Sequence, residues 1–562
     1  MRVIPFPFKF DINPGVKLPV VALLFFACPI FSQPALSDTE KLVSLCKVWG
    51  FLKYHHPEVA KGSMDWDQAL ADQLERVKAA DSPDALSGIY LSWIKGLGQV
   101  KPCKKCAEPL PPEVLTYNLD TGWIRQDRIF SDSLKRVLLY IRDNRNQGDN
   151  QYVFLPRSVG NANFDGEKPY VDMPFPSETF RLLGLFRYWN CVNYFYPYKY
   201  VIGEDWSQVL NDMIPVFREA NDTLAYHLAL KELAARLNDS HAGVVTPYTK
   251  RYYGTLKPPC ALRIIDGQVV ASGFYNDSLA RADDIRPGDV FLKAGGVAVK
   301  EIIERRWKYI PGSNLPAKWR NLSGNVLNGP TDTVTVVINR EGKELTKVIH
   351  RYPAEKFQFL PERGPVFDIL SKRIGYLNMG LVDVDAVDSI MSRLVDLEAI
   401  IFDVRNYPRG TLNRVTAWLT KGFAPYAKFT RPVPGTPGLF EWDRPNHCGS
   451  KNKKHFTGKI VLLVNDITIS HAEITCMALQ TAPNVTCIGS QTAGADGNVS
   501  TVTFPGGYET WITGIGVFYP DGRATQRTGI VPDIVAKPTI EGIREGRDEV
   551  LERAVRFIKT GK

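Results

Sequence analysis

The sequence predicts a multidomain α+β protein, and its length, composition and changing periodicity are the observations behind this prediction. The 562 residues correspond to about three to five domains of ordinary size. Apolar residues make up 44% of the chain and charged residues 23%, which excludes disordered, collagen-like and wholly membrane-embedded classes. Helical spacing dominates residues 33–106 and 177–250, whereas residues 353–562 alternate strands with helices. The net charge of +9 is spread along the chain, so a nucleic-acid partner is not indicated.

Residues 1–32 predict a signal peptide for export. An apolar stretch of about 14 residues, 18–31, follows sparse basic residues and is shorter than the roughly 20 residues that a membrane-spanning helix needs. We therefore expect an exported protein of the periplasm or cell envelope. A lipoprotein anchored at Cys28 is the alternative, although Phe25 stands where such a signal usually has leucine.

Residues 33–106 and 177–250 are predicted to be two copies of one helical module. The segment KLVSLCKVWG aligns without gaps to RLLGLFRYWN, and nine of 30 columns are identical over the longer aligned stretch. Trp49 pairs with Trp189 in this alignment. The apolar spacing is that of two helices joined at an elbow that contains proline. Both copies are therefore predicted to be helical.

The two copies differ where each of them ends. The second copy ends in LNDSHAG, which carries Asp239, Ser240 and His241. The first copy ends in IKGLGQVKPCKK and has Lys101 at the position opposite His241. Only the second copy therefore offers a histidine for chemistry at this place.

The connection between the copies contains a cysteine pair and a predicted β segment. Cys103 and Cys106 form a CxxC pair without a second pair or nearby histidines, so zinc is disfavoured. A local disulfide or two free thiols are the remaining interpretations. Residues 107–176 are rich in Pro, Asp, Asn and Gly with short apolar runs, which predicts an irregular β-rich linker.

Residues 251–352 have the spacing of strands after a break at KPP. A turn, a buried strand and a helix follow one another in ADDIRPGDVFLKAGGVAVKEIIERR, and TVTVVINREGKELTKVIH closes the segment. This stretch resembles a PDZ domain. PDZ domains bind extended peptide ends by strand addition, so the resemblance implies a polypeptide ligand. A structural spacer is the alternative.

Residues 353–562 predict an α/β core in which Ser470 occupies a turn from strand to helix. The strand KIVLLV leads through NDIT to Ser470, and HAEITCMALQ has the pattern of a helix. A helix N-terminus favours developing negative charge, so a nucleophile suits this place. Ser470 and Glu473 also fit a capping box, in which the serine only caps the helix. On the local pattern alone, the cap is the favoured interpretation.

The wider pattern resembles the C-terminal processing, or tail-specific, serine peptidases, and within them the tricorn-like branch. The resemblance implies that Ser470 is the nucleophile and that His241 is the catalytic base with Ser240 beside it. It also implies a ClpP/crotonase-like core that follows a PDZ-like domain. The matching segments, spread over residues 233–540, are LNDSHAG, IIFDVRNYPRG, VNDITISHAE, GSQTAGADG and GIVPDI.

Two departures from the family pattern concern the catalytic machinery. Where Ser/Lys members have lysine, this chain has Ala495 and Asp496, which excludes a Ser/Lys dyad. Where members that use histidine have glutamate, it has Gln526. An amide can still orient His241 through Ser240, but exchange of the orienting carboxylate can cost about 10⁴ in turnover. An orienting role for Gln526 predicts that Gln526→Glu raises turnover.

The implied reaction is acyl transfer without a metal or cofactor. Backbone N–H groups of His471 and of the turn at Arg409 and Gly410 would stabilise the oxyanion. The sequence thus predicts an exported serine endopeptidase that acts on polypeptides and uses its PDZ-like domain to present or gate them. The alternatives are a weak or inactive binding protein for an apolar ligand or peptide on the same scaffold, and a serine esterase.

Overall fold

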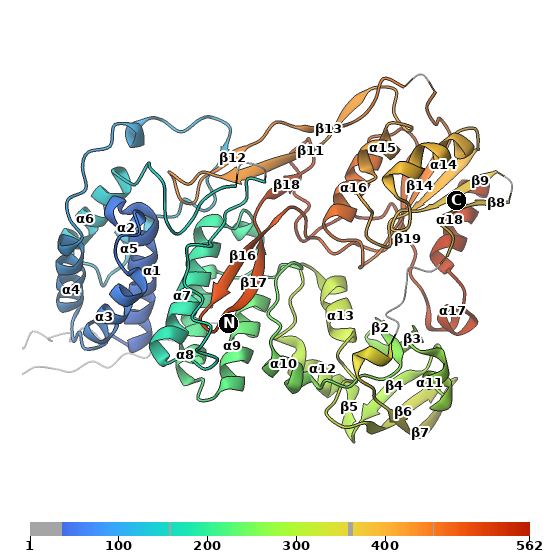
Figure 1. Ribbon diagram of the computed structural model, residues 1–562, viewed down its shortest axis with the longest axis horizontal. Coiled ribbons are helices and arrows are strands. Elements are labelled where there is room, and N and C mark those ends of the chain that lie inside the picture. Colours follow the sequence, from blue (N-terminus) through green and yellow to red (C-terminus); the bar gives the residue numbers. More distant parts are fainter. Residues whose placement is uncertain (1–35, 157–158, 358–363, 372, 453) are drawn as a thin grey trace, which may run out of the picture.

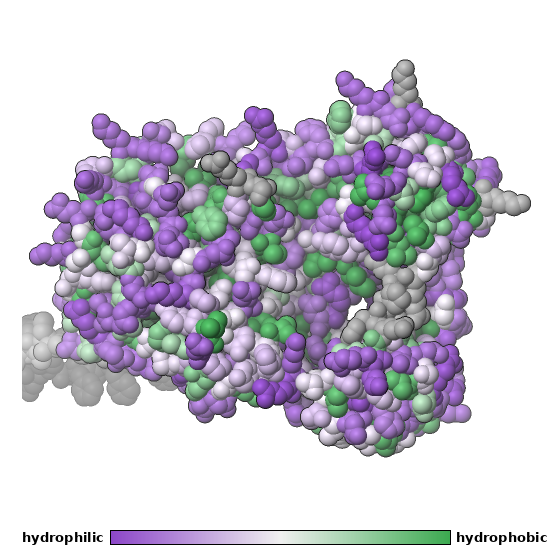
Figure 2. All heavy atoms as spheres, viewed as in Figure 1, coloured by the Kyte–Doolittle hydropathy of each residue, from purple (hydrophilic) through white to green (hydrophobic). Residues whose placement is uncertain are grey.

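The computed structural model places a helical region, a separate β unit and an α/β core side by side (Figure 1). Hydrophilic side chains cover most of the face shown in Figure 2 and are interspersed with hydrophobic ones. No helix within the described part of the chain is long and apolar enough to cross a bilayer. The predicted signal peptide and Cys28 lie outside that part. The structure describes residues 36–156, 159–357, 364–371, 373–452 and 454–562.

The two helical segments contain equivalent tryptophan contacts. Nε1 of Trp49 donates to the carbonyl oxygen of Trp66 at 3.0 Å, and Nε1 of Trp66 donates back at 3.3 Å. Trp189 and Trp206 exchange the equivalent bonds at 2.7 and 3.0 Å. The first segment comprises α1 (Asp38–His55), α2 (Pro57–Ala60), α3 (Trp66–Lys78) and α4 (Pro83–Gly96), and the second comprises α7 (Glu178–Phe195), α8 (Trp206–Glu219), α9 (Thr223–Arg236) and α10 (Pro247–Tyr253).

Four buried charges join the two helical segments. Lys53 of α1 and Arg187 of α7 both form ion pairs with Glu167, which belongs to the connection between the segments. Arg187 also donates to Asp67 of α3. All four residues are less than 10% exposed, so each charge depends on its partners. This network fixes the orientation of α1 relative to α7.

The connection between the segments is not the β-rich linker that the sequence predicts. Its described residues contain α5 (Gly122–Gln126) and α6 (Asp132–Asp143), and their only strand is the two-residue β1 (Val114–Leu115). Ser131 caps α6, and the helix buries Leu134, Leu138 and Ile141 at helical spacing. The turn-forming residues on both sides of α6 mask this periodicity in the sequence. Cys103 and Cys106 are joined by a disulfide.

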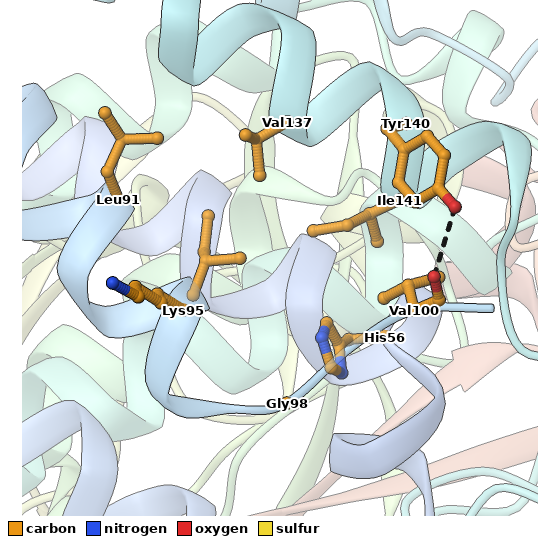
Figure 3. Close-up of a pocket in the computed structure, with 9 residues that line it drawn as sticks. His56, Leu91, Lys95, Gly98, Val100, Val137, Tyr140 and Ile141 are labelled. Carbon is orange, nitrogen blue, oxygen red and sulfur yellow. Dashed lines mark hydrogen bonds between the residues drawn. The ribbon is translucent and has the colours of Figure 1, made fainter.

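An apolar pocket of about 350 Å³ opens between α4 and α6 (Figure 3). His56 lies at its floor, and the hydroxyl of Tyr140 donates to the carbonyl oxygen of Val100 at 3.1 Å across one end. Its lining consists of His56, Leu91, Ile94, Lys95, Gly98, Val100, Val137, Tyr140 and Ile141.

The β unit lies below the core in Figure 1 and contains a six-stranded sheet of order β2-β3-β4-β6-β7, with β5 paired to β4. Its core is formed by the sheet and by helices on it, including Val336 and Leu322. The elements are β2 (Cys260–Ile265), β3 (Gln268–Phe274), α11 (Asp277–Ala282), β4 (Val290–Ala294), β5 (Val297–Ala298), α12 (Val299–Trp307), α13 (Leu315–Ser323), β6 (Thr333–Arg340) and β7 (Lys343–His350).

The α/β core is built on a six-stranded sheet of order β19-β15-β14-β10-β9-β8. The strands from β9 to β19 run parallel, and β8 is antiparallel to β9. The strands are continuous apolar runs because helices cover both faces. The elements are β8 (Phe367–Leu370), β9 (Ile374–Asn378), α14 (Val387–Leu394), β10 (Ala399–Asp403), α15 (Leu412–Thr416), β14 (Lys459–Val464), α16 (His471–Leu479), β15 (Val485–Gly489), β19 (Ile534–Val535), α17 (Ile540–Glu545) and α18 (Glu549–Thr560).

Two extensions of the core reach the helical region. β1 of the helical region pairs with β12, and so joins a five-stranded sheet with β11, β12, β13 and β18. The hairpin of β16 and β17 packs on α7, with Phe504 and Ile512 buried in the helical core (Figure 1). The two regions are therefore one packed unit. The elements of these extensions are β11 (Phe423–Pro432), β12 (Phe440–Trp442), β13 (Asn446–Gly449), β16 (Val499–Phe504), β17 (Tyr508–Thr513) and β18 (Gly516–Phe518).

Candidate active site

Ser470 occupies the tight turn between β14 and α16, as the sequence predicts. Its φ is 56°, a left-handed conformation that is uncommon for a residue with a side chain and that often marks a functional turn. Its backbone N–H donates to the carbonyl oxygen of Ala495 at 2.9 Å. The hydroxyl of Thr468 donates to the carbonyl oxygen of Val404 at 2.7 Å and so ties the start of the turn to the end of β10. The turn is thereby held at the N-terminus of α16.

Glu473 joins the Ser470 turn to the neighbouring loop. Its carboxylate is fully buried and accepts from the backbone N–H groups of Ser470 at 3.3 Å, Gly494 at 2.8 Å and Ala495 at 3.1 Å. It also accepts from the hydroxyl of Thr492. Burial raises the pKa of Glu473 to about 7, and these donors oppose the rise. The glutamate of the predicted capping box therefore holds the loop as well as the helix end.

His241 follows α9, and its side chain is only 10% exposed. Its Nδ1 lies 2.9 Å from Oγ1 of Thr513, at the end of β17, and 3.7 Å from Oδ1 of Asp239. Burial lowers the pKa of His241, Asp239 raises it, and Arg320 of α13 lowers it. Because burial is the largest of these effects, the imidazole is neutral at neutral pH, which is the form that a base needs.

Asp239 braces the loop that carries His241. It is fully buried, its Oδ1 accepts from the backbone N–H of His241 at 3.0 Å, and its Oδ2 accepts from the backbone N–H of Thr513 at 2.8 Å. The sequence places Asp239 in LNDSHAG but assigns it no role. Nothing in the sequence points to Thr513, which lies 272 residues away from His241.

Ser240 brings the His241 loop and the Ser470 turn to one loop of the core. Its hydroxyl donates to the carbonyl oxygen of Ala493 at 2.8 Å, and the N–H of Ala493 donates to the carbonyl oxygen of Thr468 at 2.9 Å. The backbone N–H of Ser470 donates to the carbonyl oxygen of Ala495 in the same loop. The two predicted catalytic residues are thus carried by neighbouring loops.

The β unit contributes to the same junction. Ser313 and Ser240 exchange two hydrogen bonds of 2.8 Å, each between a backbone N–H and the other serine's hydroxyl oxygen. Asn314, which caps α13, donates to the carbonyl oxygen of Thr492 at 2.7 Å. Arg320 of α13 donates to the carbonyl oxygen of Asp466, close to the Ser470 turn, at 2.6 Å. All three regions therefore meet at the candidate site.

Gln526 has a different partner from the one that the sequence suggests. It is 2% exposed, and its Nε2 donates to the hydroxyl of Tyr196 at 3.1 Å. Its Oε1 has no hydrogen-bond partner among the described residues. The hydroxyl of Ser240 is engaged with Ala493 and Ser313 instead. The described contacts therefore give no route from Gln526 through Ser240 to His241.

The loop after β10 lies beside the Ser470 turn, where oxyanion donors are expected. The ring of Tyr407 lies 6.0 Å from that of His471, and Gly410 adopts a φ of 73°. The N–H of His471 is free of the helix ladder because it is the first residue of α16. The side chain of Arg409 contacts Asp383 at 3.0 Å, so only its backbone is available to the turn.

The lysine position of the Ser/Lys members is occupied by buried residues in this chain. Ala495 and Asp496 are both fully buried, and burial raises the pKa of Asp496 well above its usual range. Both carboxyl oxygens of Asp496 lack a hydrogen-bond partner among the described residues. Neither residue is a base of the lysine type. No cluster of potential metal ligands occurs among the described residues.

Comparison with known proteins places this site in a peptidase family. Residues 373–536 match the sequence model of Peptidase family S41. The solved structure of mature CPAF complexed with lactacystin superimposes with a TM-score of 0.53 at 17% identity, covering 68% of this chain and 99% of that chain. A second structure of mature CPAF gives a TM-score of 0.52 at 17% identity, with the same coverage. At this identity the likeness shows a shared fold. No curated protein matches the sequence.

The family match spans β9 to β19, and therefore contains the turn with Ser470 and the loop that Glu473 holds. The match therefore assigns the α/β core to a peptidase family. Residues 373–536 therefore form a domain of peptidase family S41, and the chain is a serine-type peptidase.

Proposed function

We propose that the chain is an endopeptidase of the tricorn-like branch that cleaves polypeptides with Ser470 as nucleophile and His241 as base. The observation that carries this proposal is the loop at 493–495. It accepts a hydrogen bond from Ser240, next to the histidine, and another from the backbone of Ser470 itself. The base and the nucleophile are thereby held on either side of a single loop.

The reaction follows from this placement. Nε2 of neutral His241 takes the proton from Oγ of Ser470 as Oγ attacks the peptide carbonyl carbon. The imidazolium then gives that proton to the leaving amine, and an acyl-enzyme remains. Water, deprotonated by the same imidazole, attacks the ester and releases the acid and the free serine. The backbone N–H groups of His471 and Gly410 are the proposed oxyanion donors.

An inactive binding protein on the same scaffold is the weaker candidate. Its main support is Gln526, because an amide replaces the orienting carboxylate. Asp239, however, supplies a buried carboxylate 3.7 Å from Nδ1 of His241, so the site does not lack one. No feature of the described residues favours an esterase over a peptidase.

A fluorophosphonate probe tests the catalytic proposal. Purified wild-type protein is expected to be labelled at Ser470, and Ser470→Ala and His241→Ala are expected to lose labelling and peptide hydrolysis together. Ser389→Ala and His447→Ala are matched controls, because both residues are exposed and lie outside the site. Peptide mapping of the labelled wild type identifies the modified serine. Full hydrolysis by Ser470→Ala, or an unlabelled wild type, would refute the proposal.

The β unit is proposed to act as a PDZ-like domain that presents or gates polypeptide. Its support is the contact of α13 with both catalytic loops, through Ser313 with Ser240 and through Arg320 with Asp466. A ligand on the β unit could therefore shift the site through α13. The same preparations, assayed on peptides with free and amidated C-termini, should prefer the free end. Equal cleavage of the two forms would remove end recognition from the proposal.

Export is proposed on the leader-like sequence of residues 1–32 and is supported by the Cys103–Cys106 disulfide. Disulfides persist mainly in oxidising compartments. The intact mass of protein isolated from the cell envelope or periplasm distinguishes a chain cleaved near residue 32 from one acylated at Cys28. An uncleaved chain in the cytosol would contradict export.

A further inference from the structure

We propose that Asp239 is the carboxylate of the catalytic triad, and that it orients His241 together with the hydroxyl of Thr513. The proposal rests on the proposed Ser470–His241 chemistry. In the family pattern, a glutamate at the position of Gln526 orients the catalytic histidine. The proposal gives this orienting role to Asp239, two residues before His241. Asp239 and Thr513 are positioning residues, since they act through His241.

The contacts of the imidazole carry this proposal. Nδ1 of His241 is 2.9 Å from Oγ1 of Thr513, which is within hydrogen-bond range, and 3.7 Å from Oδ1 of Asp239. A neutral imidazole that donates from Nδ1 keeps its proton there and leaves the Nε2 lone pair free. The carboxylate of Asp239 favours a proton on Nδ1, and the hydroxyl of Thr513 can accept a hydrogen bond from it. This tautomer can take a proton from Ser470.

The position of Asp239 is rigid. Its two oxygens accept from the N–H groups of His241 and Thr513 at 3.0 and 2.8 Å, so the carboxylate is held on both sides. The same two residues provide the imidazole and the hydroxyl that meet at Nδ1. The backbone N–H groups of His241 and Thr513 therefore hold the Asp239 carboxylate, and the Thr513 hydroxyl contacts the His241 ring.

Charge also favours this assignment. When His241 becomes an imidazolium during catalysis, the nearest charged group that attracts it is Asp239, while Arg320 of α13 opposes it. Tyr188 and Tyr196 face Asp239 from α7 and the elbow after it, and burial raises the pKa of both phenols, so they stay neutral. Asp239 is therefore the carboxylate that raises the pKa of this imidazole.

The described contacts of Gln526 give it a structural role away from His241. Its Nε2 donates to Tyr196, which places it at the elbow of the second helical segment. A glutamate at this position would add a second carboxylate beside the phenol of Tyr196 in a fully buried place. This exchange is therefore expected to leave turnover unchanged or to lower it, and not to raise it.

The first test observes the wild-type protein and needs a variant only to assign the resonances. In ¹⁵N NMR spectra of histidine-labelled wild-type protein, the resonances of His241, assigned with His241→Gln, should show a neutral ring with its proton on Nδ1. A neutral ring protonated on Nε2 would overturn the proposal. This readout does not depend on hydrolysis, so it separates failure of this proposal from failure of the proposed function, which the fluorophosphonate probe reports.

The second test compares Asp239→Asn with Thr513→Val and Gln526→Glu. Asp239→Asn should lower kcat/KM by about 10²- to 10³-fold, less than the roughly 10⁴ expected for a directly bonded carboxylate. It should also move the acidic limb of the pH profile to lower pH, because Asp239 raises the pKa of His241. A solely structural role would lower stability and leave that limb in place.

Thr513→Val retains the backbone N–H that binds Asp239 and removes only the hydroxyl, so it remains informative if Asp239→Asn does not fold. Its kcat should fall at least about tenfold, the cost of a lost positioning contact, with KM little changed. Thr513→Ser should restore kcat. Unaltered kcat in Thr513→Val, or raised turnover in Gln526→Glu, would overturn the assignment.

Discussion

The two helical segments have equivalent tryptophan contacts but differ in the residues that follow their last helices. Each is closed by a reciprocal pair of tryptophan hydrogen bonds, Trp49 with Trp66 and Trp189 with Trp206. After the first segment the chain passes Lys101 and enters a loop closed by the Cys103–Cys106 disulfide. After the second it passes through Asp239 to His241, and enters the candidate site.

This difference shows that the helices and tryptophan contacts common to both segments do not by themselves create the site. What distinguishes the second segment is its contact with the core, because the hairpin of β16 and β17 packs on α7 and brings Thr513 to the end of α9. The first segment instead packs on the second through the buried charges around Glu167. The second segment therefore reaches the candidate site, and the first segment packs against the second.

Exchanging the residues at the two ends is the strongest test of this comparison. His241→Lys gives the second segment the residue of the first, and it should lower turnover by at least about 10⁴-fold, since the proposed base is lost. Lys101→His gives the first segment a histidine and should leave turnover and Tm unchanged, because Lys101 is exposed. Both variants are measured by kcat/KM and thermal unfolding. Residual activity of His241→Lys above one part in about a hundred would contradict the assignment of the base.

Much of the core could be predicted from the sequence because its signals are local. The strands β9, β10, β14 and β15 are apolar runs of the expected length, and the turn at Ser470 follows directly from the strand before it and the helix after it. The connection between the helical segments was predicted less well. The helix α6 has only three buried positions, and proline, asparagine and glycine on both sides hide its period.

The partners within the site could not be predicted, because they depend on distant parts of the chain. Thr513 contacts His241 only when β17 packs on the helical region. The local sequence LNDSHAG does not indicate this contact. The position of Gln526 could be aligned with a family glutamate, but alignment does not fix where a side chain points. In the structure it points to Tyr196.

A smaller difference in kcat/KM should distinguish the two segments when equivalent tryptophan contacts are removed from each. Trp66→Phe and Trp206→Phe each remove one buried N–H donor and part of a buried ring, which should lower the free energy of unfolding by about 1–3 kcal/mol in both cases. Trp206→Phe should also lower kcat/KM several-fold, because α8 packs against α9, which leads into the loop with Asp239 and His241. Trp66→Phe should leave kcat/KM per active site unchanged.

Urea unfolding gives the two stabilities, and titration of Ser470 with the fluorophosphonate probe corrects the rates for unfolded protein. The comparison is informative because Trp66 and Trp206 make equivalent bonds at equivalent places, so the loss of stability is matched. If both variants lower kcat/KM equally, the first segment takes part in positioning the site. If Trp206→Phe alone does so, the loop after α9 is the part of the frame on which catalysis depends.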